Sequence, residues 1–535
     1  MAFGQLNLSN NVVFITIAVV FLATLGSFAS ILLSYAIRSR RRSQFPPGPA
    51  GLPVIGNLHQ IPQKKAYFQW HEWSKQYGSM VGLKFGPQDV VILNKAKHVQ
   101  ELFDKRGALY NGRPKNHIGE DIITHDNAQI LLADYGPEWR RLRKSIQSLL
   151  SVTAVESLLP IQEAESTQLL LEMLRDAKDS YRHIRRYATA VVLASVYGQR
   201  GKTYDMPKVQ ALYHAQEQFT AILEAGATPP VDIFPILQKV PASWKKWALK
   251  IREEQRSLYR ALLEETREGI RRRGALGCLL GKLLEPGAKH GLNDEQVMYT
   301  GGTLMEAGSD TTSSTLHSWC IAMIENPEVL KASQKELDQV CGNRMPSAND
   351  LQNLPYLRAV MSETLRWRPV APGGIPHKLM QDDVYEGYVL PKGTMLFANT
   401  WSIHQDEDDY EDGAKFWPER WVKNPATGTR VESVAEKADG RRATYTFGAG
   451  RRVCPGQNMA ENSLMLVMAR IAWAFDLKAE PGHTIDSSME TGYSDGFISG
   501  PLPFQFRIEV RSKMHEEAIV AAHEEAKPFL ATFES

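Results

Sequence analysis

The spacing of apolar residues along the chain predicts a mainly helical domain. Between about 137 and 268, apolar residues recur three and four positions apart, which is the spacing of one helix face. Further helical patterns cover about 294–324 and 350–367, and the longer of the two stops at Asn326-Pro327. The stretch 226–235 is rich in proline and interrupts the helices as a loop. Helices therefore carry most of the predicted fold.

A minor β component is predicted by short apolar runs that end at turn residues. Such runs lie at 80–85 and at 90–93, on either side of Gly86-Pro87. More short strands are expected within 375–400, where Gly387-Tyr388 and the Pro-Lys-Gly at 391–393 provide turns. The predicted class is mainly α with minor β.

The first part of the chain has the pattern of a membrane anchor. Residues 12–37 contain no charge and are rich in Val, Ile, Phe and Leu. A helix of about 22 such residues spans about 33 Å, enough to cross the apolar core of a bilayer. The segment is too long for a typical cleaved signal peptide and has no polar face to suit a buried helix.

The residues that flank this segment predict its orientation. Four arginines lie within 38–42, whereas residues 1–11 carry no Lys or Arg. Basic residues stay on the cytosolic side, so residues 1–11 are expected in the lumen, with Asn7 in a possible glycosylation sequon. Residues 38–50 end in a proline-rich run that reads as a stiff hinge. We therefore expect a single-pass protein of the endoplasmic reticulum with a cytosolic main domain.

Composition narrows the class of protein further. The 535 residues are 43% hydrophobic and 23% charged, and the net charge is +2, which gives no reason to expect a nucleic-acid partner. No internal repeat or long linker divides residues 51–511, so one large catalytic domain is expected, followed by a charged helical tail at 512–535. The four cysteines contain no C-x-x-C pair and form no disulfide scaffold, which suits a reducing compartment.

The segment 447–456, Phe-Gly-Ala-Gly-Arg-Arg-Val-Cys-Pro-Gly, carries the clearest chemistry. Its glycines let the backbone approach a flat partner, and Cys454 lies just before an apolar helical run, where free N–H groups favour a thiolate. Arg452 offers a cation for a carboxylate. A dinucleotide-binding loop is a poor match because Val453 takes the place of its third glycine. A merely structural cysteine would leave the arginines and Phe447 unexplained.

This segment resembles the haem-binding signature of cytochromes P450, F-x-x-G-x-R-x-C-x-G, and matches every fixed position. The resemblance extends over about residues 45–510 and implies the P450 fold with haem b as cofactor. It implies that Cys454 is the axial ligand of the iron and that Phe447, Gly448 and Arg452 contact the haem. A thiolate ligand favours cleavage of the O–O bond.

Further motifs of the family follow in the expected order. Glu363 and Arg366 resemble its E-x-x-R pair, which binds an arginine of a later Pro-Glu-Arg segment, here Arg420. The implied network is structural, although an isolated Glu and Arg three apart are more often a surface pair. Trp421 departs from the phenylalanine that usually follows Pro-Glu-Arg.

The long central helix carries a segment that resembles the family's oxygen-binding motif. Ala307 and Gly308 would leave room for oxygen over the iron, and Asp310 and Thr311 would relay protons to it. The alternative is an ordinary buried helix whose threonine bonds back to a carbonyl. Glu306 could assist proton entry, touch substrate, or be a satisfied buried carboxylate.

Other residues are expected at the haem propionates. Trp139 and Arg143 resemble the family's W-x-x-x-R, while Arg140 and Arg141 would face solvent or a redox partner. His377 lies where relatives often carry an Arg or His that contacts the second propionate. An ordinary loop histidine is the alternative.

The resemblance implies a monooxygenase that takes O2, two electrons and two protons. The sequence contains no flavin-binding region, so the electrons would come from NADPH through a separate cytochrome P450 reductase. The expected pocket residues Leu304, Val370 and Phe497 are apolar and suit a small apolar or aromatic substrate.

Several segments look like those of fungal members that act on small phenols and polyketide-derived aromatics, so secondary-metabolite biosynthesis is expected. Alternatives are a terpenoid or alkaloid substrate, a haem-thiolate isomerase or lyase that uses no oxygen, and a non-catalytic haem sensor.

Overall fold

The computed structural model describes residues 44–534 apart from 125–127, 225, 275–276, 286 and 423–440, together with Thr16 and Gly26. Asn7, the predicted membrane segment at 12–37 except those two residues, and the start of the predicted hinge lie outside the described part. Among the described residues, no helix is long and apolar enough to cross a bilayer. The membrane anchor therefore stays a prediction.

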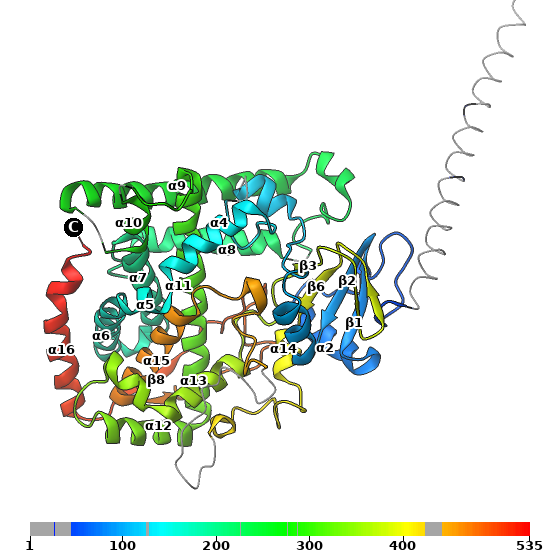
Figure 1. The fold of residues 1–535 in the computed structure, drawn as a ribbon. Helices are drawn as coiled ribbons and strands as arrows, with labels where there is room; N and C mark the ends of the chain where they lie inside the picture. Colours follow the sequence, from blue (N-terminus) through cyan, green and yellow to red (C-terminus); the bar gives the residue numbers. More distant parts are fainter. Residues whose placement is uncertain are drawn as a thin grey trace, which may run out of the picture.

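Helices dominate the fold, as the apolar spacing predicts (Figure 1). The α-helices are α2 (Ala66–Tyr77), α3 (Ala96–Val99), α4 (Pro137–Leu149), α5 (Val152–Glu156), α6 (Leu159–Arg175), α7 (Ser180–Tyr197), α8 (Pro207–Leu223), α9 (Ser243–Arg273), α10 (Leu279–Leu284), α11 (Asp294–Glu325), α12 (Pro327–Val340), α13 (Pro355–Trp367), α14 (Thr400–His404), α15 (Gln457–Ala474) and α16 (Lys513–Ala531). Short 3-10 or π turns are η2 (Leu58–Gln60), η3 (Gln100–Lys105), η4 (His117–Thr124), η5 (Ala177–Asp179), η6 (Pro235–Lys239), η7 (Ala348–Asn353), η8 (Pro418–Trp421) and η9 (Gly450–Arg452).

The central helix is α11, whose ends follow from the sequence. Asn293 caps it, because its side chain accepts a hydrogen bond from the N–H of Gln296 at 2.8 Å and the Gln296 side chain accepts one from the N–H of Asn293. It ends at Glu325, just before Asn326-Pro327, because the ring of proline prevents its predecessor from staying helical. Helix α11 contacts α4, α7, α9, α13 and α15 and so reaches most of the core.

The main sheet lies at one side of the molecule and the helices fill the other (Figure 1). Its strand order is β1-β2-β6-β3, in which β2 and β6 are parallel and the other pairs are antiparallel. The strands are β1 (Met80–Phe85), β2 (Gln88–Leu93), β3 (His377–Lys378) and β6 (Met395–Ala398), and the two small hairpins pair β4 (Asp383–Tyr385) with β5 (Tyr388–Leu390) and β7 (Phe475–Ala479) with β8 (Phe506–Val510). The strands predicted at 80–85 and 90–93 are thus confirmed.

One helix differs from the sequence expectation, and the predicted helical tail is confirmed. Helix α13 starts at Pro355 rather than near 350, because proline suits the first helical turn and the preceding residues form η7. The tail from Ser512 forms α16, which packs on α6 and buries Ile519 and Leu530. His523 Nε2 also lies 2.8 Å from Gln168 Oε1 of α6. The last helix is therefore packed into the domain.

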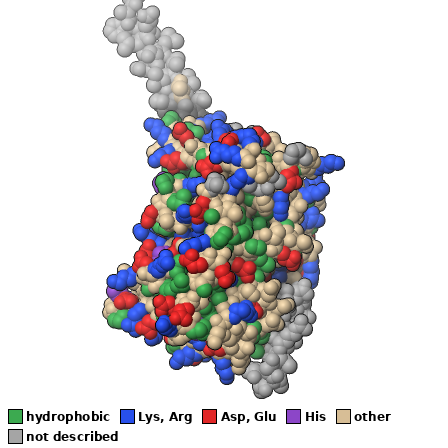
Figure 2. Space-filling view, turned by 90° about the vertical axis from the view of Figure 1, so that its left-hand side faces the viewer, with side chains coloured by type: hydrophobic (Ala, Val, Ile, Leu, Met, Phe, Trp, Pro, Cys, Tyr) green, Lys and Arg blue, Asp and Glu red, His purple; other side chains and the backbone are tan. Residues whose placement is uncertain are grey.

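The surface carries charges of both signs. On the face in Figure 2, which includes the side of α6 and α16, acidic and basic side chains alternate with apolar ones. This mixture agrees with the small net charge and gives that face no broad basic area of the kind that nucleic acids bind.

Candidate haem site

The loop before α15 has a backbone that requires its glycines. Gly448 and Gly450 have φ of +74° and +62°, and a Cβ on Gly450 would lie 2.0 Å from the carbonyl oxygen of Phe103. The N–H of Cys454 donates to the carbonyl of Phe447 at 2.8 Å and closes the loop. Cys454 therefore lies three residues before the first residue of α15.

Two kinds of interaction act in opposite directions on the ionisation of the Cys454 thiol. Burial raises the pKa of the thiol, while the backbone N–H groups of Gly456 and Gln457 and the Arg143 guanidinium act to lower it. Cys454 nevertheless keeps accessible surface, whereas Cys278, Cys320 and Cys341 are buried. A sulfur that binds a metal must present one open side, and of the four cysteines Cys454 does so.

Three arginines, Arg113, Arg143 and Arg452, lie close together beside this loop and are called the cationic cluster below. Arg452 donates from Nε to the carbonyl of Asn111 at 2.8 Å, and its guanidinium lies 4.3 Å from the centroid of a Trp139 ring. Arg143 Nη2 donates to the carbonyl of Val453 at 2.6 Å. The predicted residues Trp139, Arg143 and Arg452 are thus next to Cys454.

Arg113 and His377 extend the cluster from the side of the sheet. Arg113 Nη1 donates to the carbonyl of Pro376 at 2.6 Å, and burial together with Arg452 lowers its pKa well below the usual value. His377 Nδ1 lies 2.7 Å from the Tyr110 carbonyl, and its ring stacks on Phe103 at 3.9 Å. Burial, Arg113 and Arg452 lower the pKa of His377 well below its usual value, so the imidazole is neutral at pH 7.

These groups need an anionic partner. Within the part of the chain that the structure describes, Trp139 Nε1, Arg143 Nε and Arg452 Nη2 are buried and have no hydrogen-bond partner. Buried unpaired donors and mutually repelling arginines are costly unless a negative group satisfies them. Two carboxylates on a flat molecule bound over Cys454 would do so, and the propionates of haem are such groups.

Helix α11 presents Ala307 and Thr311 on one side. Ala307 carries accessible surface although most of its neighbours along the helix are buried. Thr311 Oγ1 donates to the carbonyl of Ala307 at 2.6 Å, which is the back-bond considered as the alternative for this threonine. A Cβ on Gly308 would lie 2.7 Å from Val192 Cγ2 of α7, so the space left by this glycine is filled by Val192.

Asp310 faces α7, and opposing effects act on the pKa of its carboxyl. Burial raises the pKa of its carboxyl, and Arg185, whose Nη2 lies 3.8 Å from Oδ1, acts to lower it. The Arg185 guanidinium lies 3.8 Å from the centroid of the Tyr213 ring. Asp310 keeps 29% of its side chain exposed, so it is an acid with access to water.

Glu306 is a buried carboxylate with its own partners in α9. It accepts hydrogen bonds from Gln255 Nε2 at 3.0 Å and from the hydroxyl of Tyr259. Burial raises its pKa to about 7. Of the alternatives stated for this residue, the satisfied buried carboxylate agrees with these contacts.

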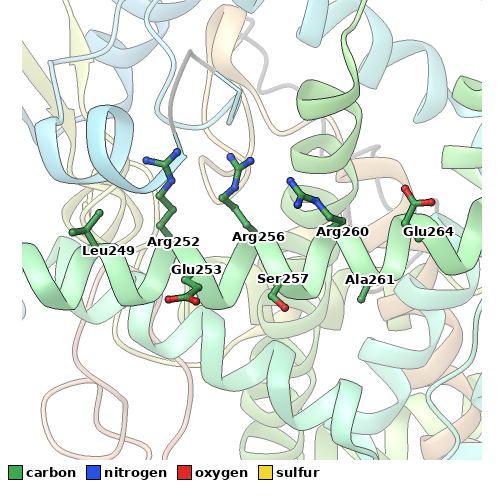
Figure 3. A pocket seen from close by; sticks show the side chains of 8 residues that line it. All are labelled: Leu249, Arg252, Glu253, Arg256, Ser257, Arg260, Ala261 and Glu264. Carbon is green, nitrogen blue, oxygen red and sulfur yellow. The ribbon is translucent and has the colours of Figure 1, made fainter.

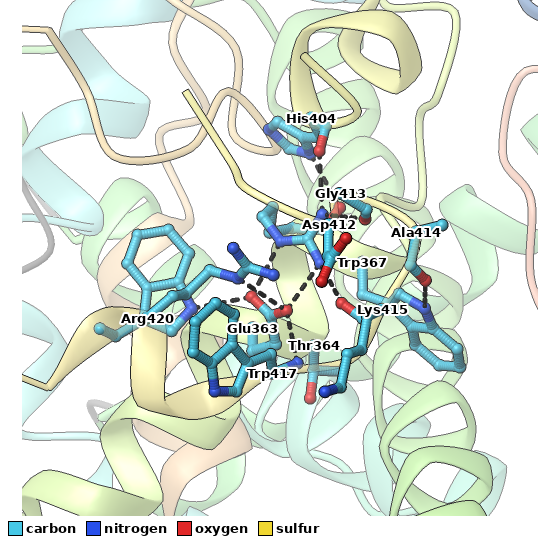
Figure 4. Close-up of polar contacts among 12 residues, drawn as sticks. Glu363, Thr364, Trp367, His404, Asp412, Gly413, Ala414, Lys415, Trp417 and Arg420 are labelled. Carbon is cyan, nitrogen blue, oxygen red and sulfur yellow. Dashed lines mark hydrogen bonds and ion pairs between the residues drawn. The ribbon is translucent and has the colours of Figure 1, made fainter. Parts of the chain in front are cut away.

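The residues Glu363, Arg366 and Arg420 form the network that the motif implies (Figure 4). Arg366 binds both oxygens of Glu363 at 2.6 and 2.8 Å, and neither side chain is exposed. Arg420 Nε donates to Glu363 Oε1 at 3.1 Å. Trp421 Nε1 donates to Glu363 Oε2 at 2.9 Å, so the indole supplies a bond that a phenylalanine could not make.

Comparisons with known proteins agree with this geometry. The family model described as Cytochrome P450 matches residues 46–508. The chain belongs to the cytochrome P450 family. It is 36% identical to cytochrome P450 monooxygenase yanC of Aspergillus niger, over 93% of this chain and 95% of that protein. It is 35% identical to cytochrome P450 monooxygenase atE of Aspergillus terreus (94% and 95% covered) and 34% identical to macC of Penicillium terrestre (91% and 94%).

The P450 is therefore a monooxygenase, and membership of the family implies haem iron with a thiolate ligand. Of the expected pocket residues, Val370 lies beside the segment that carries Phe497, because the N–H of Ser499 donates to the Val370 carbonyl at 2.8 Å. Leu304 lies one turn before Ala307 on α11 and is partly buried.

Sequence reasoning missed Arg113, Arg185 and Gln255 in this P450. Arg113 lies three residues after Tyr110 and just before a proline. Nothing in that local pattern indicates that its side chain reaches the carbonyl of Pro376. Arg185 and Gln255 become partners of α11 only through the packing of α7 and α9 on it. Such contacts between distant segments leave no local signal.

A groove of about 590 Å³ lies elsewhere, along α9 (Figure 3). Arg252, Arg256 and Arg260 point to the same side of this helix. Arg256 binds Glu295 at the start of α11, including a bond of 3.0 Å from Nη2. The groove is lined by α9 alone and contains none of the predicted site residues, so it plays no part in the haem site.

Proposed function

We propose that this P450 inserts one oxygen atom from O2 into a small apolar or aromatic molecule, and that the Cys454 thiolate would bind the iron of haem b. The observation that carries the proposal is the pairing of an accessible Cys454 with the unpartnered donors of Trp139, Arg143 and Arg452. Haem, when bound through a thiolate, supplies the activation of oxygen. Arg113, Arg143 and Arg452 would hold its propionates, and Phe447, Gly448 and His377 would also contact it.

Asp310 and Thr311 act as the proton relay. Burial raises the pKa of the Asp310 carboxyl, so this carboxyl holds its proton up to a higher pH than an exposed aspartate does. It can then give up that proton on the side of the site where oxygen binds. The Thr311 hydroxyl donates to the Ala307 carbonyl, so its lone pairs stay free to accept a hydrogen bond on the oxygen side. It would pass its own proton on when the bond to Ala307 opens and would take a replacement from a hydrogen-bonded donor.

Electrons come from NADPH through a separate P450 reductase. Arg143 reaches the Cys454 loop from α4, and the same helix exposes Arg140, Arg141 and Lys144. This short basic surface is suited to an acidic redox partner close to the thiolate side of the haem.

The substrate is a small phenol or polyketide-derived aromatic of fungal secondary metabolism. The apolar character of Leu304, Val370 and Phe497 supports an apolar ring, and the relatives reported above are monooxygenases of fungi. The direct experiment is turnover of 3-methylphenol by the full chain with NADPH and a reductase. Formation of a hydroxylated product supports the proposal, whereas binding only of bulky terpenoids contradicts it.

The P450 resides in the endoplasmic reticulum membrane with its catalytic domain in the cytosol. Exposed apolar side chains lie near the start of the domain, at Leu52 and Val54, and in and just after η6, at Ile236 and Val240. A Cβ on Gly86 would lie 2.7 Å from Ile233 Cγ2, so the loop before η6 lies against the turn between β1 and β2. Such a surface suits contact with lipid beside the anchor at 12–37.

A further inference from the structure

Lys65 is a largely buried lysine whose side chain holds a loop that is distant in the sequence. Its side chain is only 9% exposed, and its ammonium donates to the carbonyls of Met489, Glu490 and Tyr493 at 2.9, 2.8 and 2.7 Å. A lysine has three N–H donors, so these three bonds use all of them. Burial lowers the pKa of Lys65, with Asp495 acting to raise it. The loop 489–493 is thereby fastened to the start of α2.

The backbone at Lys65 adopts a strained conformation that the surrounding contacts must hold in place. Lys65 has φ of +51° and ψ of +42°, the left-handed region, as the residue before α2. A residue other than glycine in this region costs about 1 kcal/mol or more and persists only where its surroundings impose it. The three hydrogen bonds from the Lys65 ammonium to carbonyl groups can hold this conformation.

The loop that Lys65 holds leads directly into the hairpin that carries Phe497. Ser494 and Gly500 close this hairpin through a bond of 2.8 Å from the Ser494 N–H to the Gly500 carbonyl. The N–H of Ser499 donates to Val370, also at 2.8 Å. A short chain of hydrogen bonds and backbone thus links Lys65 to the hairpin of Phe497 and to Val370.

A second set of charges lines the same junction. Lys64 Nζ lies 2.6 Å from Asp495 Oδ2, and this pair is partly exposed. Glu224, which follows α8, lies so near the hairpin that a Cβ on Gly496 would be 2.6 Å from its Oε1. The turn at Lys64-Lys65 therefore joins α2, the end of α8 and the hairpin.

We propose that Lys65 is a positioning residue for the substrate pocket: it fixes the hairpin of residues 494–500 and thereby sets how tightly the pocket encloses a ligand at the haem. The proposal rests on the proposed function, because that function assigns Phe497 and Val370 to the pocket. It makes Lys65, outside the haem signature and far from it in sequence, a determinant of ligand size.

The test compares two ligands that bind haem iron through the same imidazole nitrogen. Lys65→Met is measured against the control Lys75→Met, which removes an exposed lysine paired with Glu72 on the same helix. We expect Lys65→Met to weaken binding of 4-phenylimidazole about five-fold in a spectral titration and to leave that of unsubstituted imidazole unchanged. Lys75→Met should bind both ligands as the wild type does.

Lys65→Gly is the second variant, because glycine relaxes the left-handed backbone and offsets part of the lost stability. In the wild type, hydrogen exchange at residues 494–500 should slow with 4-phenylimidazole but not with imidazole. Wild-type affinity for both ligands in either folded variant, or equal exchange in the wild type with both, would overturn the proposal.

These assays need no turnover, so the two proposals fail separately. A haem-loaded protein that lacks the reduced carbon-monoxide band of a thiolate ligand contradicts the proposed function. A normal band together with unchanged imidazole titrations contradicts the role of Lys65 alone.

Discussion

At the scale of single residues, charge is distributed differently on the two sides of the haem site. The cationic cluster lies beside Cys454, while Asp310 lies on α11 with Arg185 as its partner. The arginines of the first set suit an anionic partner, whereas the partly buried carboxyl of Asp310 suits proton exchange. The two sides thus suit cofactor binding and proton transfer.

Asp310→Asn tests the second role. The amide keeps the size of the carboxyl but carries no transferable proton, so we expect product formation to fall on the order of 100-fold. The haem spectrum should stay that of the wild type. The measurement is product formed per NADPH consumed, with Glu217→Gln as a control at another acid that acts on Asp310. A variant with wild-type yield would remove Asp310 from the relay.

Two variants of the network around Glu363 are expected to lower the free energy of unfolding by different amounts. Trp421→Phe removes one donor to the carboxylate and should lower the free energy of unfolding by about 1 kcal/mol. Glu363→Gln leaves the fully buried Arg366 without a counter-charge and should cost about 3–5 kcal/mol. Denaturant unfolding and haem content measure both. Equal losses in the two variants would contradict the arrangement in Figure 4.

At the scale of elements, the contact between α9 and α11 contains a pH-sensitive group. Glu306 has a pKa of about 7 in the folded protein and an ordinary value near 4.5 when unfolded. The folded state therefore binds the proton more tightly, so this stability is complete below pH 4.5 and is lost as the pH rises through 7. The full difference is about 3 kcal/mol.

Thermal melting at pH 5.5 and pH 8.5 measures this effect. The wild type should lose more stability between these values than Glu306→Gln, because glutamine cannot ionise. Glu264→Gln, at a half-exposed carboxylate of the same helix pair, should follow the wild type. An identical pH response in wild type and Glu306→Gln would mean that Glu306 does not titrate in this range.

The elements also separate what the sequence can predict from what it cannot. The bounds of α11 follow from Asn293 and Pro327, and the order of motifs places Glu363, Arg420 and Cys454 in one fold, because these signals are local or belong to the family. The filling of Gly308 by Val192 and the partner of Asp310 depend on how α7 crosses α11. No local pattern encodes that crossing.

At the scale of the whole molecule, the predicted anchor and the exposed apolar residues near η6 predict one orientation of the catalytic domain at the membrane. If residues 12–37 span the membrane with residues 1–11 in the lumen, the catalytic domain lies in the cytosol. Alkaline carbonate should leave the full chain in the membrane fraction, and protease added to intact microsomes should digest the domain. Release by carbonate or protection from protease would contradict this topology.

The central claim is that Cys454 is the thiolate ligand of a haem-dependent monooxygenase. The most direct measurement is the carbon-monoxide difference spectrum of the dithionite-reduced full chain, with Cys454→Ala and the control Cys341→Ala beside the wild type. If the Cys454 thiolate binds the iron, a strongly red-shifted Soret band is expected in the wild type and in Cys341→Ala, and no such band in Cys454→Ala. A folded, haem-loaded wild type without that band, or a band that survives in Cys454→Ala, would contradict it.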